Sequence, residues 1–565
     1  MAEEEASRNK LRIGIMCNGL DFPAWAAKCI EETCALDFVE PILLIQDFNS
    51  QTGYKNIFFK LLQYPWNKLL FRTFDRFFLR PSAFANTNLK DILSNLSVVQ
   101  CQTTLKGKYS QHFSQEDIQT IRDHKPDIIL RFGFNIIRGE ILDVAKYGVW
   151  SYHHCDPQKY RGGPPGFWEI MNDDPVTGVV LQRLTDKLDG GIVLKKGYFK
   201  TIDKSLTDNM DHVFWGGVSW VKQVCIDINN GSSDYLNDPP METDAPIFKY
   251  PNNIRFIQYF FRKWRNTFRF HCNELFRPEQ WNVGVIRKST LDIMKHGLTN
   301  EEVEWLPLIG RRKYRADPFL VNTHNGLEIL CERYSYKKKS ARIERIPLND
   351  VEKGRKAISE KHHLSYPFVF TYKDEQYCVP EALESGSIGL YHLDRPSGEW
   401  QMRNILLENF SGLDPTLVDY NGKWWLFCTN NDPMSNTSLY LFYAETPLGP
   451  FKSHANNPVK NDIRSSRPAG PFFKDNDDLI RPTQDCSGTY GSRVVFNRIV
   501  EITPETFKEE IAGYLEPLKD SPYPEGLHTI SGLGDITVID GKRYVANFDN
   551  FCTALFRKIK KLFIR

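Results

Sequence analysis

The sequence lacks several features that would point directly to a compartment or a cofactor. Its 12 cysteines are scattered without a CxxC pair, which argues against a structural zinc site and a disulfide framework and favours a reducing compartment. The net charge is only +2, so no global field indicates nucleic acid as a partner. No apolar run reaches the length of a membrane span, and the first residues, MAEEEASRNK, do not resemble a signal peptide. We therefore expect a cytoplasmic protein.

A length of 565 residues is too great for one core, and the sequence pattern changes midway, so two domains are expected. In the first part, apolar runs at 11–16, 38–46, 127–132 and 147–152 alternate with helical stretches. Such alternation predicts an open, mainly parallel α/β sheet whose ligands bind beyond the carboxyl ends of the strands. We assign this α/β domain to residues 1–250.

Two segments, residues 54–80 and 256–268, interleave aromatic residues with Lys and Arg. They either lie on a membrane surface or pack as amphipathic elements that join two domains. The second interpretation makes residues 251–300 a linker. Residues 551–565 include FRKIKKLFIR and are expected to form a basic amphipathic tail, for which peripheral membrane contact at the inner face is the corresponding hypothesis.

From about residue 300, short β-runs alternate with turns and repeat. The copies DPFLVNTHNGLEIL, YPFVFTYKDEQYCV and DPTLVDYNGKWWLF begin at Asp317, Tyr366 and Asp414, and more divergent copies begin at Arg467 and Gly532. A strand-rich period of about 50 residues is typical of propeller blades. The sequence therefore predicts an all-β five-bladed propeller over residues 301–550.

The most distinctive motif lies between Gly148 and Leu194, where GVWSYHHCDPQKYRGGPPGFWEI is followed by TGVVLQRLTDKLDGGIVL. The order of strand, His, YRG loop, helix, TGV strand and Asp resembles the core of the formyltransferase family that uses 10-formyltetrahydrofolate. That family includes methionyl-tRNA formyltransferase and the sugar N-formyltransferases. The resemblance is specific over 126–194 and implies a Rossmann-type α/β fold, an acyl-transfer enzyme and 10-formyltetrahydrofolate as co-substrate.

The resemblance also implies roles for individual residues. His153 and Asp189 match the family's catalytic His and Asp, and Tyr160, Arg161 and Gly162 match its substrate loop. The stretch PDIILRFGFNIIRGEIL matches the segment whose loop holds the pterin end of the folate. The cofactor-binding residues implied by that match are Phe132, Gly133, Phe134, Asn135 and Ile137.

One departure from the family pattern affects the chemistry. Ser151 stands where the family has an Asn whose amide stabilises the oxyanion, and losing such a donor costs on the order of 100-fold in rate. His154 first and Asn135 second are the candidates to replace it. The domain is either a divergent transferase with a rebuilt oxyanion hole or an inactive relative, and the retained His153 favours the active form. No metal site is expected, because no further ligand follows the paired His at a recognised spacing.

Carboxylates stand at corresponding positions of the predicted blades, namely Asp317, Glu381 and Asp414. The repeat resembles the propellers of glycoside hydrolases such as arabinanases, and the propeller of some plant sphingolipid glycosyltransferases. This resemblance implies acidic residues near the propeller axis that act at a glycosidic bond. We expect a sugar-sized axial pocket lined by the three carboxylates together with Arg481 and His528. The alternative is that each carboxylate only caps its own blade.

The favoured function is an N-formyltransferase that acts on the amine of an amino sugar, free or nucleotide-linked, in polysaccharide or glycoconjugate biosynthesis. The alternative is a glycosidase or glycosyltransferase centred on the propeller, with the α/β domain as a non-catalytic binding module. A third hypothesis is a non-catalytic scaffold that touches a membrane. The first two make a sugar the expected partner, and the sequence indicates no oligomeric state.

Overall fold

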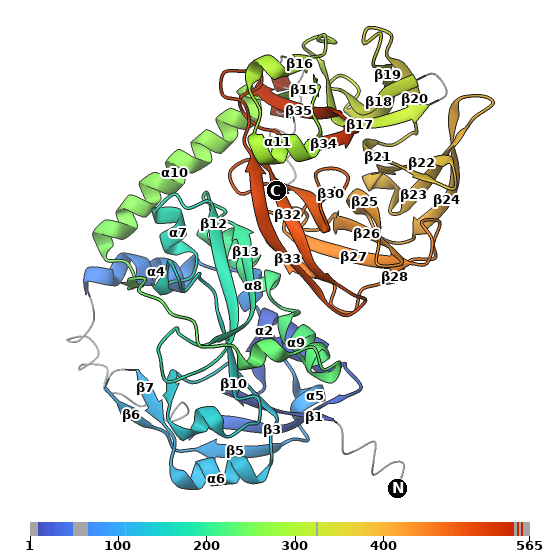
Figure 1. Cartoon of the computed structure of the whole chain (residues 1–565). Coiled ribbons are helices and arrows are strands. Elements are labelled where there is room, and N and C mark those ends of the chain that lie inside the picture. Colours follow the sequence, from blue (N-terminus) through green and yellow to red (C-terminus); the bar gives the residue numbers. More distant parts are fainter. Residues whose placement is uncertain are drawn as a thin grey trace, which may run out of the picture. The chain divides into compact units, whose positions relative to one another are not determined.

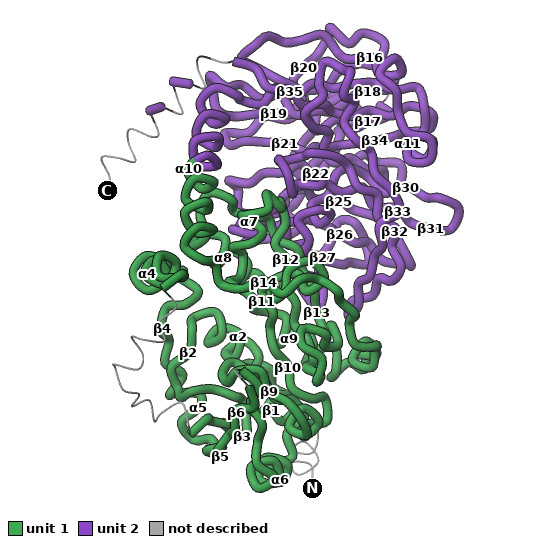
Figure 2. The backbone as a smooth tube through the Cα atoms, turned by 90° about the vertical axis from the view of Figure 1, so that its left-hand side faces the viewer, with its two compact units in different colours: residues 1–264 green, residues 265–565 purple. Residues whose placement is uncertain are grey.

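The computed structural model describes residues 10–48, 66–107, 109–323 and 326–546, together with residues 548, 551–552 and 555–556. The chain divides into two compact units, residues 1–264 and residues 265–565 (Figure 2). Part of the first aromatic segment, residues 54–65, and most of the expected tail over 551–565 lie outside the described residues. In the described part of the chain, no helix combines the length and the apolarity that crossing a membrane requires.

The first unit is built on a seven-stranded mixed sheet, as the alternating pattern predicts (Figure 1). Five neighbouring strands of this sheet pair in parallel, and two antiparallel strands extend one edge. Their spatial order is β13 (Ile192–Lys200), β12 (Val176–Arg183), β10 (Val149–His153), β8 (Ile128–Arg131), β1 (Leu11–Cys17), β3 (Val39–Asp47) and β5 (Ser97–Cys101). The four apolar runs of the sequence correspond to β1, β3, β8 and β10.

Helices and short strands complete this unit. Ser114 caps one helix, accepting a hydrogen bond from the Asp117 N–H at 3.0 Å, and Ser205 caps another in the same way. Met16, Ile45, Ile129 and similar apolar side chains form the core between sheet and helices. The longer helices are α2 (Ala24–Cys34), α6 (Gln115–Asp123), α7 (Phe167–Met171), α8 (Leu206–Gly216) and α9 (Trp220–Asn229).

The aromatic and basic segments form two helices that contact each other, α4 (Leu69–Phe77) and α10 (Asn253–Phe276). Phe74 of α4 lies with its ring centroid 5.2 Å from that of Phe256, and Asn253 accepts a hydrogen bond from the Leu70 N–H at 3.0 Å. The inner faces therefore pack, as the amphipathic interpretation expects. Aromatic side chains on the outer faces stay exposed, for example Phe261 at 71%.

The second unit contains five antiparallel sheets, which follow one another around a common centre in Figure 1 and form the expected five-bladed propeller. The first four blades are consecutive in sequence. Blade 1 consists of β17 (Lys313–Thr323), β18 (Gly326–Ser335), β19 (Ser340–Pro347) and β20 (Arg355–Ile358), and blade 2 of β21 (Ser365–Tyr372), β22 (Glu375–Glu381), β23 (Ile388–Asp394) and β24 (Glu399–Leu407). Blade 3 consists of β25 (Gly412–Tyr420), β26 (Lys423–Asn430), β27 (Ser438–Ala444) and β28 (Lys452–Ser453), and β29 (Lys460–Asn461) also pairs with β27. Blade 4 consists of β30 (Phe473–Asp475), β31 (Asp478–Asp485), β32 (Arg493–Ile502) and β33 (Phe507–Leu515).

Blade 5 joins the two ends of the propeller. Its strands β34 (Ile530–Leu533) and β35 (Ile536–Tyr544) continue into β15 (Glu279–Ile286) and β16 (Glu304–Trp305). β15 pairs with β35 over its whole length. The range 251–300, expected as a linker, holds all of α10 and the blade strand β15. Such closure removes the free edges that an open ring of sheets would expose.

Candidate functional site

In the first unit, the motif residues come together at the end of β10. His153 Nδ1 lies 3.7 Å from Asp189 Oδ1, and the Arg161 Nε–H donates to Asp189 Oδ2 at 3.4 Å. Burial lowers the pKa of His153 in spite of the opposing charge of Asp189, so the imidazole is neutral at neutral pH. Its Nε2 is buried and has no hydrogen-bond partner among the described residues.

The YRG loop is fixed by a short parallel ladder between β11 (Arg161–Gly162) and β14 (Ile247–Phe248). Gly162 has a φ of 89°, and a Cβ at this position would lie 2.1 Å from the Phe248 carbonyl oxygen. Only glycine fits such a close approach. Tyr160 donates its hydroxyl hydrogen to Asp174 at 3.3 Å and is itself buried. The glycine of the motif is therefore required by backbone packing.

Two further predicted site residues of the first unit, Ser151 and His154, make contacts within that unit. The Ser151 hydroxyl donates to the main-chain carbonyl of Tyr152 at 3.4 Å. His154 stacks on Phe214, with 3.6 Å between ring centroids, and lies edge-on to Trp25. The His154 ring is thus part of the aromatic core. Its Nε2 is buried there without a partner among the described residues.

The side chains of the 132–137 loop are mostly used for packing. Phe132 packs edge-on against Trp25, Phe134 contacts Phe113, and Ile137 is buried in the core. Gly133 leaves no room for a side chain, because a Cβ would lie 3.1 Å from the Cys17 backbone. Asn135 alone of this group is exposed.

In the second unit, the first strand of blades 1, 2 and 3 carries a β-bulge at the same place. Asp317 in β17, Tyr366 in β21 and Asp414 in β25 have φ values of 50°, 42° and 49°, and each precedes a proline. The register with the neighbouring strand shifts at each of these residues. A bulge re-aims the side chain of its residue. The repeat thereby brings a polar side chain to the same level of successive blades.

Carboxylates join neighbouring blades at this level. The Tyr366 N–H of blade 2 donates to Asp317 of blade 1 at 3.2 Å, and the Asp414 N–H of blade 3 donates to Glu381 of blade 2 at 3.1 Å. The Asp317 N–H in turn donates to Asp540 of blade 5 at 3.1 Å. Asp317, Glu381 and Asp540 therefore each accept a backbone hydrogen bond from the next blade, and Asp540 also accepts two from its own blade.

Arg467 provides the positive charge between two of these carboxylates. Its Nε lies 2.5 Å from Asp414 Oδ2, and its Nη2 lies 3.3 Å from Glu381 Oε2. The Gln484 amide also donates to Asp414 at 2.7 Å. Asp414 is 2% exposed, Glu381 7% and Arg467 8%, so the ion pairs are nearly free of solvent screening. Fixed charges in such a site interact strongly with any polar ligand that enters.

His528 lies between two further carboxylates. Its Nε2 is 3.1 Å from Asp317 Oδ1, and its Nδ1 is 2.7 Å from Asp540 Oδ2. Burial by itself would lower the pKa of His528, but the charges of Asp540 and Asp317 outweigh it and raise the pKa well above the usual value. The ligand atoms of these three residues lie within 4.8 Å of one another, so the group could also hold a metal ion. With both ring nitrogens facing carboxylates, His528 is better placed as an imidazolium cation.

Two neighbouring carboxylates at the axis have pKa values shifted in opposite directions. Burial opposes ionisation of Asp317, but the charge of His528 outweighs it and lowers the pKa of Asp317. Glu332, on the adjacent strand β18, has its pKa raised by burial and by the charge of Asp317. These surroundings thus favour the ionised form of Asp317 and the protonated form of Glu332. Opposed shifts of this kind define a base and an acid in glycoside chemistry.

The set of residues found at the axis differs from the predicted set in one residue, Arg481, and contains four residues that were not predicted. Arg481 contacts Glu509 of β33, with Nε 2.8 Å from Oε2, and not the axial carboxylates, so its assignment to the axis is corrected. The repeat contained a signal for Glu332, which follows Asp317 at the offset by which Glu381 follows Tyr366. The added residues are Glu332, Arg467, Gln484 and Asp540.

The fold thus defines a two-domain protein with a mixed-sheet α/β unit and a five-bladed β-propeller. Residues 349–521 match the family described as "Glucosamine inositolphosphorylceramide transferase 1, N-terminal". A protein of Oryza sativa subsp. japonica named glucosamine inositolphosphorylceramide transferase 1 is 39% identical over 158 residues, 27% of this chain and 21% of that relative. The chain thus spans about a fifth of that relative's length.

The first unit has relatives of its own. The methionyl-tRNA formyltransferase of Prochlorococcus marinus is 32% identical over 104 residues, 17% of this chain and 31% of that protein.

Among solved structures, a family 117 glycoside hydrolase of Zobellia galactanivorans covers 49% of this chain and 92% of its own, with 15% identity and a TM-score of 0.31.

These comparisons correct the predicted function. The family model over residues 349–521 and the rice relative at 39% identity are named as glucosamine inositolphosphorylceramide transferase 1, and the methionyl-tRNA formyltransferase of Prochlorococcus marinus is the weaker match at 32%. The prediction of an N-formyltransferase acting on an amino sugar is therefore wrong.

Proposed function

We propose that this chain is a carbohydrate-active transferase of glycoconjugate synthesis that binds a sugar at the propeller axis. The observation that carries the proposal is the pair of axial carboxylates with opposed ionisation, Asp317 and Glu332. The family match over residues 349–521 and the named activity of the plant relatives support the choice of glycosyl transfer. The α/β unit then serves as a binding module.

The chemistry follows from the two carboxylates. Ionised Asp317 accepts the proton of an attacking acceptor hydroxyl while the new bond to the anomeric carbon forms. Glu332 gives its proton to the departing oxygen as the old glycosidic bond breaks. Arg467 compensates the charge of Asp414, and His528 compensates that of Asp540, so that a substrate meets a prearranged set of dipoles and ions.

The test is transfer of a labelled sugar from a panel of sugar nucleotides to inositol phosphate lipid and to free inositol, with each carboxylate removed in turn. Asp317→Asn and Glu332→Gln should each lower the transfer rate by about 100-fold or more. Asp535→Asn and Glu399→Gln change exposed carboxylates of the same propeller and should leave the rate unchanged.

Hydrolysis is the second candidate, because water can replace the acceptor hydroxyl at the same two carboxylates. Release of a chromogenic group from glycosides without transfer to any acceptor would favour it. Wild-type rates in both axial variants would refute the axial site for either reaction.

A further inference from the structure

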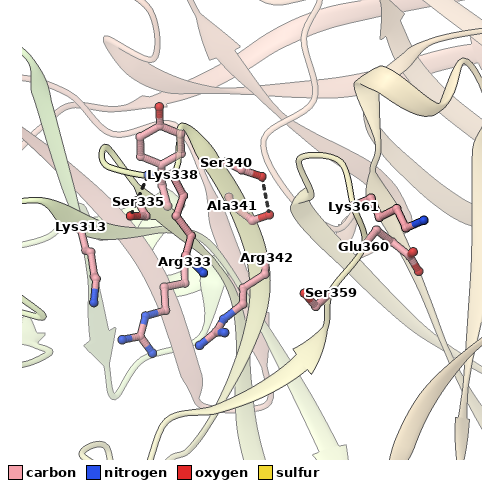
Figure 3. Close-up of a pocket in the computed structure, with 11 residues that line it drawn as sticks. Lys313, Arg333, Ser335, Lys338, Ser340, Ala341, Arg342, Ser359, Glu360 and Lys361 are labelled. Atoms are coloured by element: carbon pink, nitrogen blue, oxygen red, sulfur yellow. Dashed lines mark hydrogen bonds between the residues drawn. The ribbon is translucent and has the colours of Figure 1, made fainter. Parts of the chain in front are cut away.

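A basic cavity of about 390 Å³ lies at one end of blade 1 (Figure 3). It is bounded by the start of β17, the end of β18, the start of β19 and the segment 359–361. Five basic side chains line it, and one carboxylate, Glu360, is the single acidic member of the lining. The five are Lys313, Arg333, Lys338, Arg342 and Lys361. So uneven a set of charges in one cavity favours an anion as its occupant.

The positive charge of the cavity is largely uncompensated. Among the described residues, Arg333 alone of the five has a carboxylate in ion-pair range, the fully buried Glu344. Glu344 also pairs with Arg315, with 2.8 Å between Oε2 and Nε. Glu360 is engaged elsewhere, because its Oε1 accepts the Tyr391 hydroxyl hydrogen at 3.1 Å. A bound anion would therefore meet cations that the fold leaves available.

The arrangement suits a tetrahedral oxyanion. In Figure 3 the guanidinium groups of Arg333 and Arg342 and the ammonium of Lys313 point to the same side of the blade. Glu344 holds the Arg333 guanidinium in place, which lowers the entropy lost when it binds a ligand. Arginine forks match phosphate oxygens in a bidentate manner, and lysine adds a point charge. Serine hydroxyls at Ser335, Ser340 and Ser359 supply neutral donors.

The wall of the cavity is linked to Glu332 through His363. Arg333 of the cavity directly follows Glu332 on β18, and their side chains leave opposite faces of the strand. His363 bridges the two regions: its Nε2 lies 3.5 Å from Glu332 Oε1, and its Nδ1 accepts a hydrogen bond from the N–H of Ala341 in the cavity wall at 3.2 Å. A ligand in the cavity and a sugar near Glu332 are therefore neighbours on one blade.

We propose that this cavity binds the phosphate or diphosphate group of the sugar substrate, and this inference rests on the proposed function. The shared chemistry is a phosphate ester next to a sugar ring. It can come from the diphosphate of a nucleotide sugar or from the phosphodiester of an inositol phosphate headgroup. A cavity of about 390 Å³ holds either group.

Binding is measured on the full chain by titration calorimetry with inorganic pyrophosphate, a uridine diphosphate and inositol 1-phosphate, without any turnover. We expect binding that weakens as salt is added, because the contacts are ionic. The double variant Lys313→Gln/Arg342→Gln should weaken binding at least tenfold. Lys474→Gln/Lys508→Gln removes two exposed charges from another blade and should change it less than twofold.

The preferred ligand identifies the source of the phosphate: tighter binding of the uridine diphosphate indicates a nucleotide sugar, and tighter binding of inositol 1-phosphate indicates the headgroup. Unchanged binding in the cavity variant, or binding by none of the three ligands, would overturn the proposal. Asp317→Asn separates this result from the catalytic one, because it should bind the anions as the wild type does while losing transfer. Failure of transfer with normal anion binding would refute the proposed reaction and leave the cavity assignment standing.

Discussion

Removal of Arg467 gives the strongest stability test of the axial cluster. Its guanidinium contacts Asp414 at 2.5 Å and Glu381 at 3.3 Å, and all three residues are less than 10% exposed. Breaking a buried pair by deleting one partner costs about 3–5 kcal/mol, because a charge is left without compensation. Two carboxylates lose their cation in Arg467→Gln. We therefore expect a loss near the upper end of that range, a few thousandfold in the opening equilibrium at about 1.4 kcal/mol per factor of ten.

Amide hydrogen exchange of the full chain measures this loss locally, since the chain has two units and does not offer one unfolding transition. Peptides covering β25 and β26 should lose protection, while peptides covering β10 and β12 of the other unit should not change. Arg498→Gln is a matched control, because this half-exposed arginine pairs with Asp478 and Glu510 at the surface. Surface pairs contribute about 0–1 kcal/mol.

The variant should also recover partly at low pH, because protonation of Asp414, whose pKa is raised by burial, removes an uncompensated charge. A double variant, Arg467→Gln/Asp414→Asn, should be less destabilised than the sum of its single variants. A loss below about 1 kcal/mol for Arg467→Gln, or additive effects, would show that water screens the cluster and would refute the reasoning.

The remaining predictions address other regions. Gly162→Ala should lower the melting temperature, because its Cβ would meet the Phe248 carbonyl; a wild-type melting curve would contradict the close approach. The pKa of His528 is raised in the folded protein, so its contribution to the free energy of unfolding is complete below the pKa of the unfolded chain and is lost as the pH rises through the folded pKa. We expect the stability of the propeller to fall on that alkaline side, and His528→Gln to remove this pH dependence. The proposed membrane contact of α4 and α10 predicts cosedimentation with phosphatidylserine vesicles that Phe261→Ala/Trp264→Ala weakens severalfold; no binding by the wild type would exclude it.

Local sequence signals were sufficient for most of the architecture. The repeat that begins at Asp317, Tyr366 and Asp414 indicated the blades, because strand and turn preferences act over short stretches of chain. The motif around His153 and Asp189 likewise indicated two side chains that the structure brings to 3.7 Å. These elements depend on neighbours in sequence and on the spacing of turns, which a single sequence contains.

Contacts between distant segments were decided by tertiary structure alone. β15 lies inside the expected linker and pairs with β35, more than 200 residues later in the chain. The sequence of β15 does not identify that partner strand. His154 was a candidate oxyanion donor from the sequence, but in the structure its ring packs against those of Trp25 and Phe214. The sequence marked Arg467 only as the first residue of a divergent repeat copy, because its carboxylate partners come from other blades. Charge compensation and burial are set by the packing of chain segments far apart in sequence, and this is why only the folded propeller shows which side chains act together.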